Sequence, residues 1–399
     1  MFQLSSDKTF HFELLRILAH SAYHGADVGE VLVAAGEIAP GDFESWYRAF
    51  NKRAERLGSQ LADSRCYRNP VSVRDAHFRA ATYYRAADFY LHMNWDDPRV
   101  ADLWKKQAAH FDAAMALLDA PAYRKSLPGD DGTTVPILFF APSRDESVRR
   151  PTVVLGNGFD GSMEELYHMH GAAALERGYN VVIYEGPGQP TVRREQGLGF
   201  THEWEKVVKP VLDYLETLPS VDMRCVALMG YSLSGVLAAR AAAFDHRVKA
   251  LLQIDAVYDF ADSNIVRAVH KSLGHLHDLE SAKIACYDPS IPTGMRWAIS
   301  QGLWSFKLQS VADFVEKTKD YTLRGIIDKI ECPVFVGDPD HDMFFLGQAQ
   351  KIKELLGDRA TLVTMTDDDA AGYHCHVGAQ RFTNAVMWEW FDEKVVSKA

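Results

Sequence analysis

The sequence predicts an α/β protein built on a mostly parallel, twisted β-sheet with helices on both faces. From about residue 125, short apolar and β-branched runs alternate with helical segments, a pattern typical of such sheets. Residues before that point have helical spacing, and a second helical stretch interrupts the strand pattern later. We therefore expect a helical N-terminal domain (1–125), a core in two parts (126–258 and 331–399) and an inserted helical lid (259–330).

The N-terminal domain is predicted from helical spacing and capping residues. Asp42 is a plausible N-cap, and the apolar residues that follow it lie on one helical stripe. A second helical stretch covers 71–93. Asp97-Pro98 opens a third, because aspartate caps a helix and proline fits its first turn. The stripe after Asp42 consists of Trp46, Phe50, Leu57 and Leu61.

The core strands are predicted from continuous apolar or β-branched runs. Helices are expected between them, for example at 163–177, 202–218 and 233–244. The segment 259–330 contains no good core strand and is too long for an unstructured loop. A lid is one interpretation of it, and extra helices packed on one sheet edge are the other. The strands are expected at 135–140, 152–155, 180–184, 225–229, 250–254, 334–337 and 361–365.

Composition excludes several classes of function. A net charge of −11 and a pI near 5.8 argue against a nucleic-acid surface. The sequence shows neither a bilayer-spanning apolar run nor a signal peptide, so we expect a cytoplasmic protein without membrane contact. The five cysteines are widely spaced without a CxxC pair, and there is no HExxH. We therefore predict no disulfide framework, no metal and no cofactor.

Ser232 is the strongest candidate for a catalytic residue. The strand 225–229 leads into Gly230, Ser232 follows two residues later, and a helix of small residues begins at once. This strand–turn–helix context is that of a nucleophile elbow. In the usual Gly-x-Ser-x-Gly motif a glycine stands where this chain has Ser234, and a serine would be strained there if φ were positive. Ser234 as nucleophile and a chance GxS turn are weaker interpretations.

A serine nucleophile needs a base and an acid that orients the base. Chain order places the acid after the strand 334–337, where Asp338, Asp340 and Asp342 compete. Counting from the start of the strand favours Asp342, and counting from its end favours Asp340. The base is expected after the last strand, where His374 and His376 both qualify. We predict His374 as the base and Asp342 as the acid.

The loop after the strand 152–155 is rich in glycine, so its backbone N–H groups can face a ligand. We predict that the N–H groups of Phe159 and Leu233 stabilise an oxyanion. An ordinary βα turn is the simpler interpretation, and the loop lacks the GxGxxG spacing of a dinucleotide site. Weaker candidates for the substrate pocket are Tyr231, Asp160, His168, His170 and Trp304.

Taken in order, these motifs resemble one branch of the α/β-hydrolases. That branch carries a helical N-terminal domain and includes 2,6-dihydropseudooxynicotine hydrolase and the heptaketide hydrolases of fungal melanin synthesis. The start of the chain, from Phe10-His11-Phe12-Glu13 to Glu44-Ser45-Trp46-Tyr47, resembles hydrolases of fungal polyketide gene clusters, such as the fusarin type. The motifs are GNGFDG at 156–161, EGPGQ at 185–189, GYSLSG at 230–235, DPDHD at 338–342 and AGYHC at 371–375.

The resemblance implies an α/β-hydrolase fold, helices that close over the triad, and a homodimer, and it supports Asp342 and His374. The sequence therefore predicts a serine hydrolase acting on a small polyketide-like carbonyl compound in secondary metabolism. The bond cleaved is an ester, a lactone, or a C–C bond beside a ketone. One alternative is an off-loading or ring-closing catalyst that uses the same acyl-Ser232. Another is an inactive binding or scaffold protein.

Overall fold

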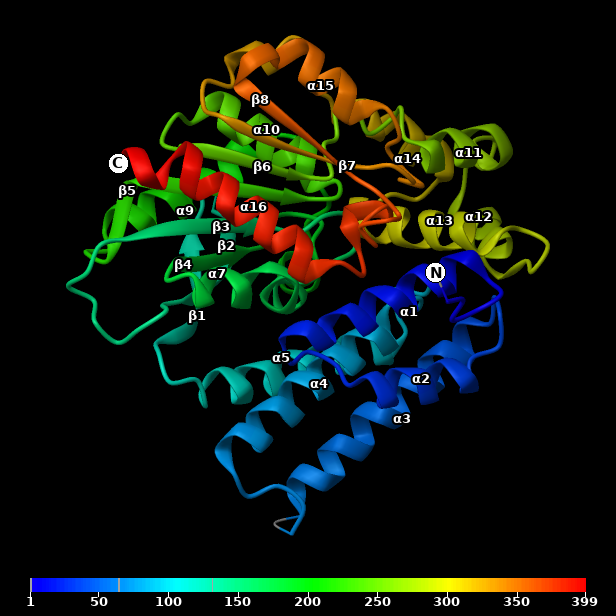
Figure 1. The fold of residues 1–399 in the computed structure, drawn as a ribbon. Helices are drawn as coiled ribbons and strands as arrows, with labels where there is room; N and C mark the ends of the chain where they lie inside the picture. Colours follow the sequence, from blue (N-terminus) through cyan, green and yellow to red (C-terminus); the bar gives the residue numbers. More distant parts are fainter. Residues whose placement is uncertain (1, 64, 131) are drawn as a thin grey trace.

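The computed structural model describes residues 2–63, 65–130 and 132–399. Eight strands form one sheet in the order β1-β2-β4-β3-β5-β6-β7-β8 (Figure 1). β2 pairs antiparallel with β1 and β4, and all other pairs are parallel. The predicted fold class is confirmed. The strands are β1 Ala122–Pro128, β2 Thr134–Phe140, β3 Arg150–Gly156, β4 Asn180–Tyr184, β5 Val221–Tyr231, β6 Ala250–Ile254, β7 Val334–Pro339 and β8 Ala360–Met365.

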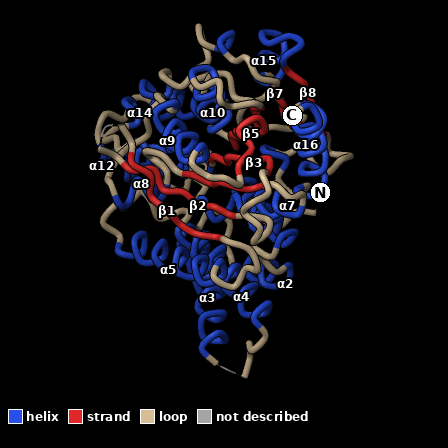
Figure 2. Tube along the Cα trace, turned by 90° about the vertical axis from the view of Figure 1, so that its left-hand side faces the viewer, coloured by secondary structure: helices blue, strands red, loops and turns tan. Residues whose placement is uncertain are grey.

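The central strands are buried on both faces, which explains their continuous apolar sequence. In β3, Val154 packs into the core on one face, whereas Val153 and Leu155 pack into the core on the other. Helices cover each face (Figure 2). Those packed in the first core are α9 Glu205–Glu216, α10 Ser234–Phe244 and α15 Gln348–Leu356. Those packed in the second are α7 Ala172–Glu176 and α16 Gln380–Lys394. Two short helices, α6 Met163–Leu166 and α8 Pro190–Glu195, follow β3 and β4.

Five helices precede the sheet and pack against one another beside it (Figure 1). The predicted caps Asp42 and Asp97 each accept hydrogen bonds from backbone N–H groups at the start of their helices. Trp46 is fully buried with Phe50 and Phe10, and this cluster belongs to the same apolar core as one face of the sheet. The helices are α1 Lys8–Ala19, α2 Val28–Glu37, α3 Phe43–Ala62, α4 Pro70–Asp88 and α5 Pro98–Met115.

Strand β1 corrects the predicted extent of the helical region. Helix α5 ends at Met115 and β1 begins at Ala122, so residue 125 lies inside a strand. The strand was missed because it lies at the edge of the sheet and carries the polar run Arg124-Lys125-Ser126. An edge strand of this kind lacks the apolar signal that marks a buried one.

Four α-helices lie within the segment 259–330. Among the described residues, its β-structure is limited to an isolated bridge between Asp259 and Thr322. Its third helix contacts the N-terminal region, since Arg296 donates to the Gly41 carbonyl at 2.8 Å. No helix within the described ranges is long and apolar enough to span a bilayer. The helices of this segment are α11 Asn264–Leu273, α12 Leu279–Tyr287, α13 Thr293–Phe306 and α14 Val311–Thr318.

We predict that Trp46→Ala lowers the free energy of unfolding by about 3–5 kcal/mol, because it empties a fully buried site. The substitution also removes the hydrogen bond from Trp46 Nε1 to the Ala86 carbonyl, 2.8 Å long. Chemical denaturation of wild type and variant measures the change. Phe382 on α16 is 41% exposed, so Phe382→Ala is the control and should change stability by less than about 1 kcal/mol. Equal effects of the two substitutions would contradict the packing described.

Candidate active site

Ser232 lies in a sharp turn between β5 and α10. Its φ of +57° is unusual for a residue other than glycine and costs about 1–3 kcal/mol. A Cβ at Gly230 would lie 2.0 Å from the Ser234 carbonyl oxygen, so only glycine fits there. Ser234 is the first residue of α10 and has no positive φ. Serine in place of the usual glycine is therefore unstrained.

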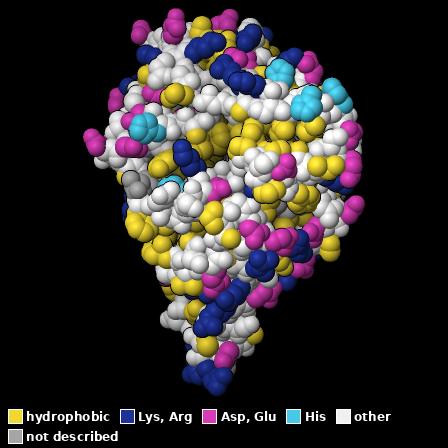
Figure 3. All heavy atoms as spheres, turned by 90° about the vertical axis from the view of Figure 1, so that its right-hand side faces the viewer, with side chains coloured by type: hydrophobic (Ala, Val, Ile, Leu, Met, Phe, Trp, Pro, Cys, Tyr) yellow, Lys and Arg dark blue, Asp and Glu magenta, His cyan; other side chains and the backbone are white. Residues whose placement is uncertain are grey.

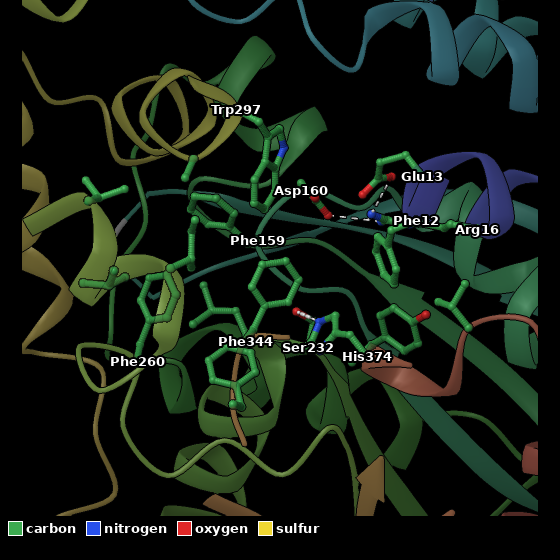
Figure 4. A pocket seen from close by; sticks show the side chains of 18 of the residues that line it. Phe12, Glu13, Arg16, Phe159, Asp160, Ser232, Phe260, Trp297, Phe344 and His374 are labelled. Atoms are coloured by element: carbon green, nitrogen blue, oxygen red, sulfur yellow. Dashed lines mark hydrogen bonds and ion pairs between the residues drawn. The ribbon is translucent and has the colours of Figure 1, made fainter. Parts of the chain in front are cut away.

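The structure brings Ser232, His374 and Asp342 together from three separate segments. His374 lies in a short 3₁₀ turn, His374–His376, that follows β8, and Asp342 follows β7. His374 Nε2 lies 2.9 Å from Ser232 Oγ (Figure 4). His374 Nδ1 lies 3.0 Å from Asp342 Oδ1. This geometry allows the imidazole to take a proton from the hydroxyl while a carboxylate holds its other nitrogen.

Asp255 is a second carboxylate beside the same imidazole, and sequence reasoning missed it. Asp255 Oδ2 is in contact with His374 Nδ1, and both carboxylate oxygens accept the Cys375 N–H at 3.0 and 3.1 Å. It directly follows β6, so it stands at the same sheet edge as Ser232. An aspartate at the carboxyl end of a central parallel strand is the sequence signal that could have identified it.

The two carboxylates differ in how they are stabilised. Burial raises the pKa of Asp342, but the His374 charge and the N–H groups of Phe344 and Phe345 lower it by more. Burial raises the pKa of Asp255, and His374 opposes this only in part. Asp342 is therefore the carboxylate that stays ionised more readily.

These neighbours favour the charged form of His374, the imidazolium that arises when it takes a proton from Ser232. Burial lowers its pKa, whereas the charges of Cys375, Asp255 and Asp342 raise it by more, so that it lies well above its usual value. The Cys375 thiol has its own pKa raised to about 12 by burial. It is uncharged at neutral pH, so the two carboxylates carry the effect there.

The rival candidates lie elsewhere. Asp338 accepts hydrogen bonds from Gln350 and Thr364. Asp340 lies beside His341 and Asp367 at a partly exposed position. His376 is buried, and its Nδ1 lies 2.8 Å from the Ala371 carbonyl. Among the described residues, none of these three rivals forms a hydrogen bond with Ser232.

The glycine-rich loop after β3 packs directly against the turn at Ser232. A Cβ at Gly158 would lie 2.8 Å from Ser232 Cβ and 3.1 Å from the Leu233 nitrogen. Neither the Phe159 N–H nor the Leu233 N–H donates a hydrogen bond to another described residue. Both residues line the same cavity as Ser232. Gln301 of α13 holds the loop from outside by donating to the Phe159 carbonyl at 2.8 Å.

Ser232 and His374 line a cavity of about 680 Å³, part of it open to solvent. Its walls are mostly aromatic and aliphatic, with a few charged groups. Hydrophobic side chains also gather around a hollow on the face that carries α11 and α12 (Figure 3). The aromatic lining is Phe12, Phe159, Tyr231, Phe260, Trp297, Phe314, Phe344 and Phe345.

Two predicted pocket residues line the cavity and three do not. Tyr231 and Asp160 line it. His168 is wrong as a pocket residue, because it is buried against the N-terminal helices and its Nδ1 bonds the Tyr23 carbonyl. His170 instead bonds Asn384. Trp304 is also wrong as a pocket residue, because its ring stacks on His92 with the ring centroids 4.2 Å apart. Trp297, from the same helix, lines the cavity instead.

Comparison with known proteins gives relatives over nearly the whole chain. The chain is 31% identical to hydrolase acrC of Aspergillus aculeatus over 99% of this chain and 98% of that protein. It is 30% identical to the 20-hydroxy-prefusarin hydrolase of Gibberella moniliformis, over 100% of this chain and 99% of that protein. It is 32% identical to the α/β-hydrolase xenA of Xenoacremonium sinensis, over 85% of this chain and 83% of that protein. No family model matches.

The fold has solved counterparts. The crystal structure of 2,6-dihydroxy-pseudo-oxynicotine hydrolase superposes with a TM-score of 0.69 at 20% identity, covering 95% of this chain and 96% of that one. At that identity the likeness concerns the fold. It extends over the N-terminal helices as well as the sheet, in agreement with the resemblance drawn from the motifs.

We predict that the His374 imidazole titrates above pH 6.5, because two carboxylates face its Nδ1. Asp255→Asn and Asp342→Asn should each lower this pKa, since each removes one negative charge from its neighbourhood. Titration of the imidazole by NMR measures the shifts. Asp340→Asn is the control and should leave the pKa unchanged. An imidazole that titrates below 6.5 in wild type would contradict the arrangement.

Proposed function

This chain belongs to the α/β-hydrolase family of its fungal relatives, and we propose that it is a serine-dependent hydrolase of a small, polyketide-like carbonyl compound. Ser232 would be the nucleophile, His374 the base and Asp342 the acid that orients the base. The observation that carries the proposal is the hydrogen-bonded series from Asp342 through His374 to Ser232. Ser232, at the end of this series, lines the mostly apolar cavity.

The chemistry follows from the positions of these groups. Ser232 Oγ attacks the substrate carbonyl while His374 Nε2 takes its proton. The oxyanion that forms accepts hydrogen bonds from the N–H groups of Phe159 and Leu233. His374 then protonates the leaving group, which is an alkoxide when the bond is an ester or lactone and a carbanion or enolate when it is a C–C bond beside a ketone. Water attacks the acyl-Ser232 in the second half of the reaction and restores the serine.

The cavity supports an apolar substrate. Most of its lining is aromatic or aliphatic, so burial of an apolar ligand surface drives binding. The relative in Gibberella moniliformis is named for a prefusarin substrate, and the motifs at the start of this chain resemble hydrolases of fungal polyketide clusters. A role in secondary metabolism is therefore part of the proposal.

A ring-closing catalyst is the second candidate, and the same lining favours it. Capture of the acyl-Ser232 by an internal hydroxyl replaces attack by water when water is scarce at the ester. Phe12 of the N-terminal helices and Trp297 of α13 both line the cavity and restrict water there. Product analysis distinguishes a free acid from a lactone.

We expect an alkyl fluorophosphonate to label the protein on Ser232. The label should be lost in Ser232→Ala, and Ser234→Ala, the matched control in the same turn, should keep it. Activity on an ester substrate should fall by about 10⁴-fold or more in Ser232→Ala. Intact-mass and peptide mass spectrometry locate the label. A folded wild-type protein that takes no label would support the scaffold interpretation instead.

A further inference from the structure

The catalytic cavity has one charged corner, formed by Glu13, Arg16 and Asp160. Glu13 and Arg16 come from α1, and Asp160 comes from the glycine-rich loop after β3. Figure 4 shows the three side chains gathered at one side of the cavity, apart from Ser232 and His374. The catalytic residues need none of these groups for the chemistry described above. The corner thus calls for a separate explanation.

Arg16 is fully engaged by its carboxylate neighbours. Its guanidinium donates to Glu165 at 2.5 and 2.8 Å, to Asp160 at 3.1 Å and, at the longer distance of 3.4 Å, to Glu13. Arg85 adds a second guanidinium, 3.2 Å from Glu165. Arg16 therefore fixes the corner in place but has little hydrogen-bonding capacity left for a ligand.

Glu13, by contrast, is poorly satisfied. Its side chain is 5% exposed, and the bond to Arg16 at 3.4 Å involves only Oε2. Oε1 accepts no hydrogen bond from any residue in the described ranges, and the same holds for Asp160 Oδ2. Neither of these two oxygens is sealed off from solvent, and both residues line the cavity, so a hydrogen-bond donor on a ligand can reach them. Burial raises the pKa of Glu13 to about 7, against the opposing charge of Arg16.

The balance of charge decides what the corner accepts. When Glu13 is ionised, three carboxylates (Glu13, Asp160 and Glu165) face two guanidiniums (Arg16 and Arg85). An anionic ligand group would meet repulsion there, and an apolar group would leave the two open oxygens unpaired. A hydroxyl or an amide N–H satisfies them, because each donates a hydrogen bond without adding negative charge.

We propose that Glu13 and Asp160 form a subsite that binds a hydrogen-bond-donating group, a hydroxyl or an amide N–H, remote from the carbonyl that Ser232 attacks. This inference rests on the proposed function and specifies its substrate class. The substrate is an apolar molecule with one donor group at a fixed distance from its reactive carbonyl. Because Glu13 belongs to α1, the N-terminal helices select the substrate rather than only covering the site.

The test uses pairs of p-nitrophenyl esters of straight-chain acids that differ only at the far end of the chain, methyl or hydroxyl. Each pair is compared across a series of chain lengths by kcat/KM. Wild type should prefer the hydroxyl-ended ester by about tenfold to hundredfold at the lengths that reach the corner. Glu13→Leu should abolish that preference, and Glu13→Gln, which keeps the shape, should reduce it.

Glu30→Gln is the matched control. It removes a carboxylate of α2 that pairs with Arg79 at 3.1 Å and does not line the cavity, so the preference should persist. If wild type hydrolyses both esters of every pair equally well, this inference is overturned and the proposed function stands. This outcome is measured on the wild-type protein alone, so it does not depend on whether a variant folds. If no ester is hydrolysed and Ser232 takes no fluorophosphonate, both are overturned.

Discussion

The candidate site depends on the His374 imidazole, which links the Ser232 hydroxyl to two carboxylates. One ring nitrogen meets Ser232 Oγ and the other meets Asp342, with Asp255 beside it. These residues follow β8, β5, β7 and β6, four parallel strands that are neighbours in the sheet. The carboxyl ends of parallel strands lie at the same edge of the sheet, so residues that are far apart in the sequence come together there. The order of the strands in the sheet thus brings these four residues together.

Elements outside the sheet complete the cavity. Arg16 of α1 bonds the Asp160 side chain, and Arg85 of α4 donates to the Asp160 carbonyl at 3.2 Å. Gln301 of α13 bonds the Phe159 carbonyl. The loop that supplies a proposed oxyanion donor is therefore held from two directions, by the N-terminal helices and by the helical insertion. Such support keeps a donor aimed where charge develops.

The sequence predicts what depends on local pattern or on chain order. Buried strands have continuous apolar runs, and Ser232, Asp342 and His374 occur in the order that this fold requires. The edge strand β1 has a polar sequence and gives no such signal. Asp255 was missed because chain order placed the acid after the strand 334–337, whereas Asp255 directly follows the strand 250–254. The approach of Glu13 to Asp160, residues far apart in the chain, is set by tertiary packing and has no local signature. His168 was misplaced for the same reason, because a π-helical turn directs it to the N-terminal helices.

A crystal structure of the protein after reaction with an alkyl fluorophosphonate tests the central claim most directly. The account predicts phosphorus bonded to Ser232 Oγ, with a phosphoryl oxygen about 3 Å from the backbone nitrogens of both Phe159 and Leu233. His374 should remain within hydrogen-bonding distance of Asp342. A phosphonate on another residue, or a phosphoryl oxygen pointing away from both N–H groups, would contradict the account.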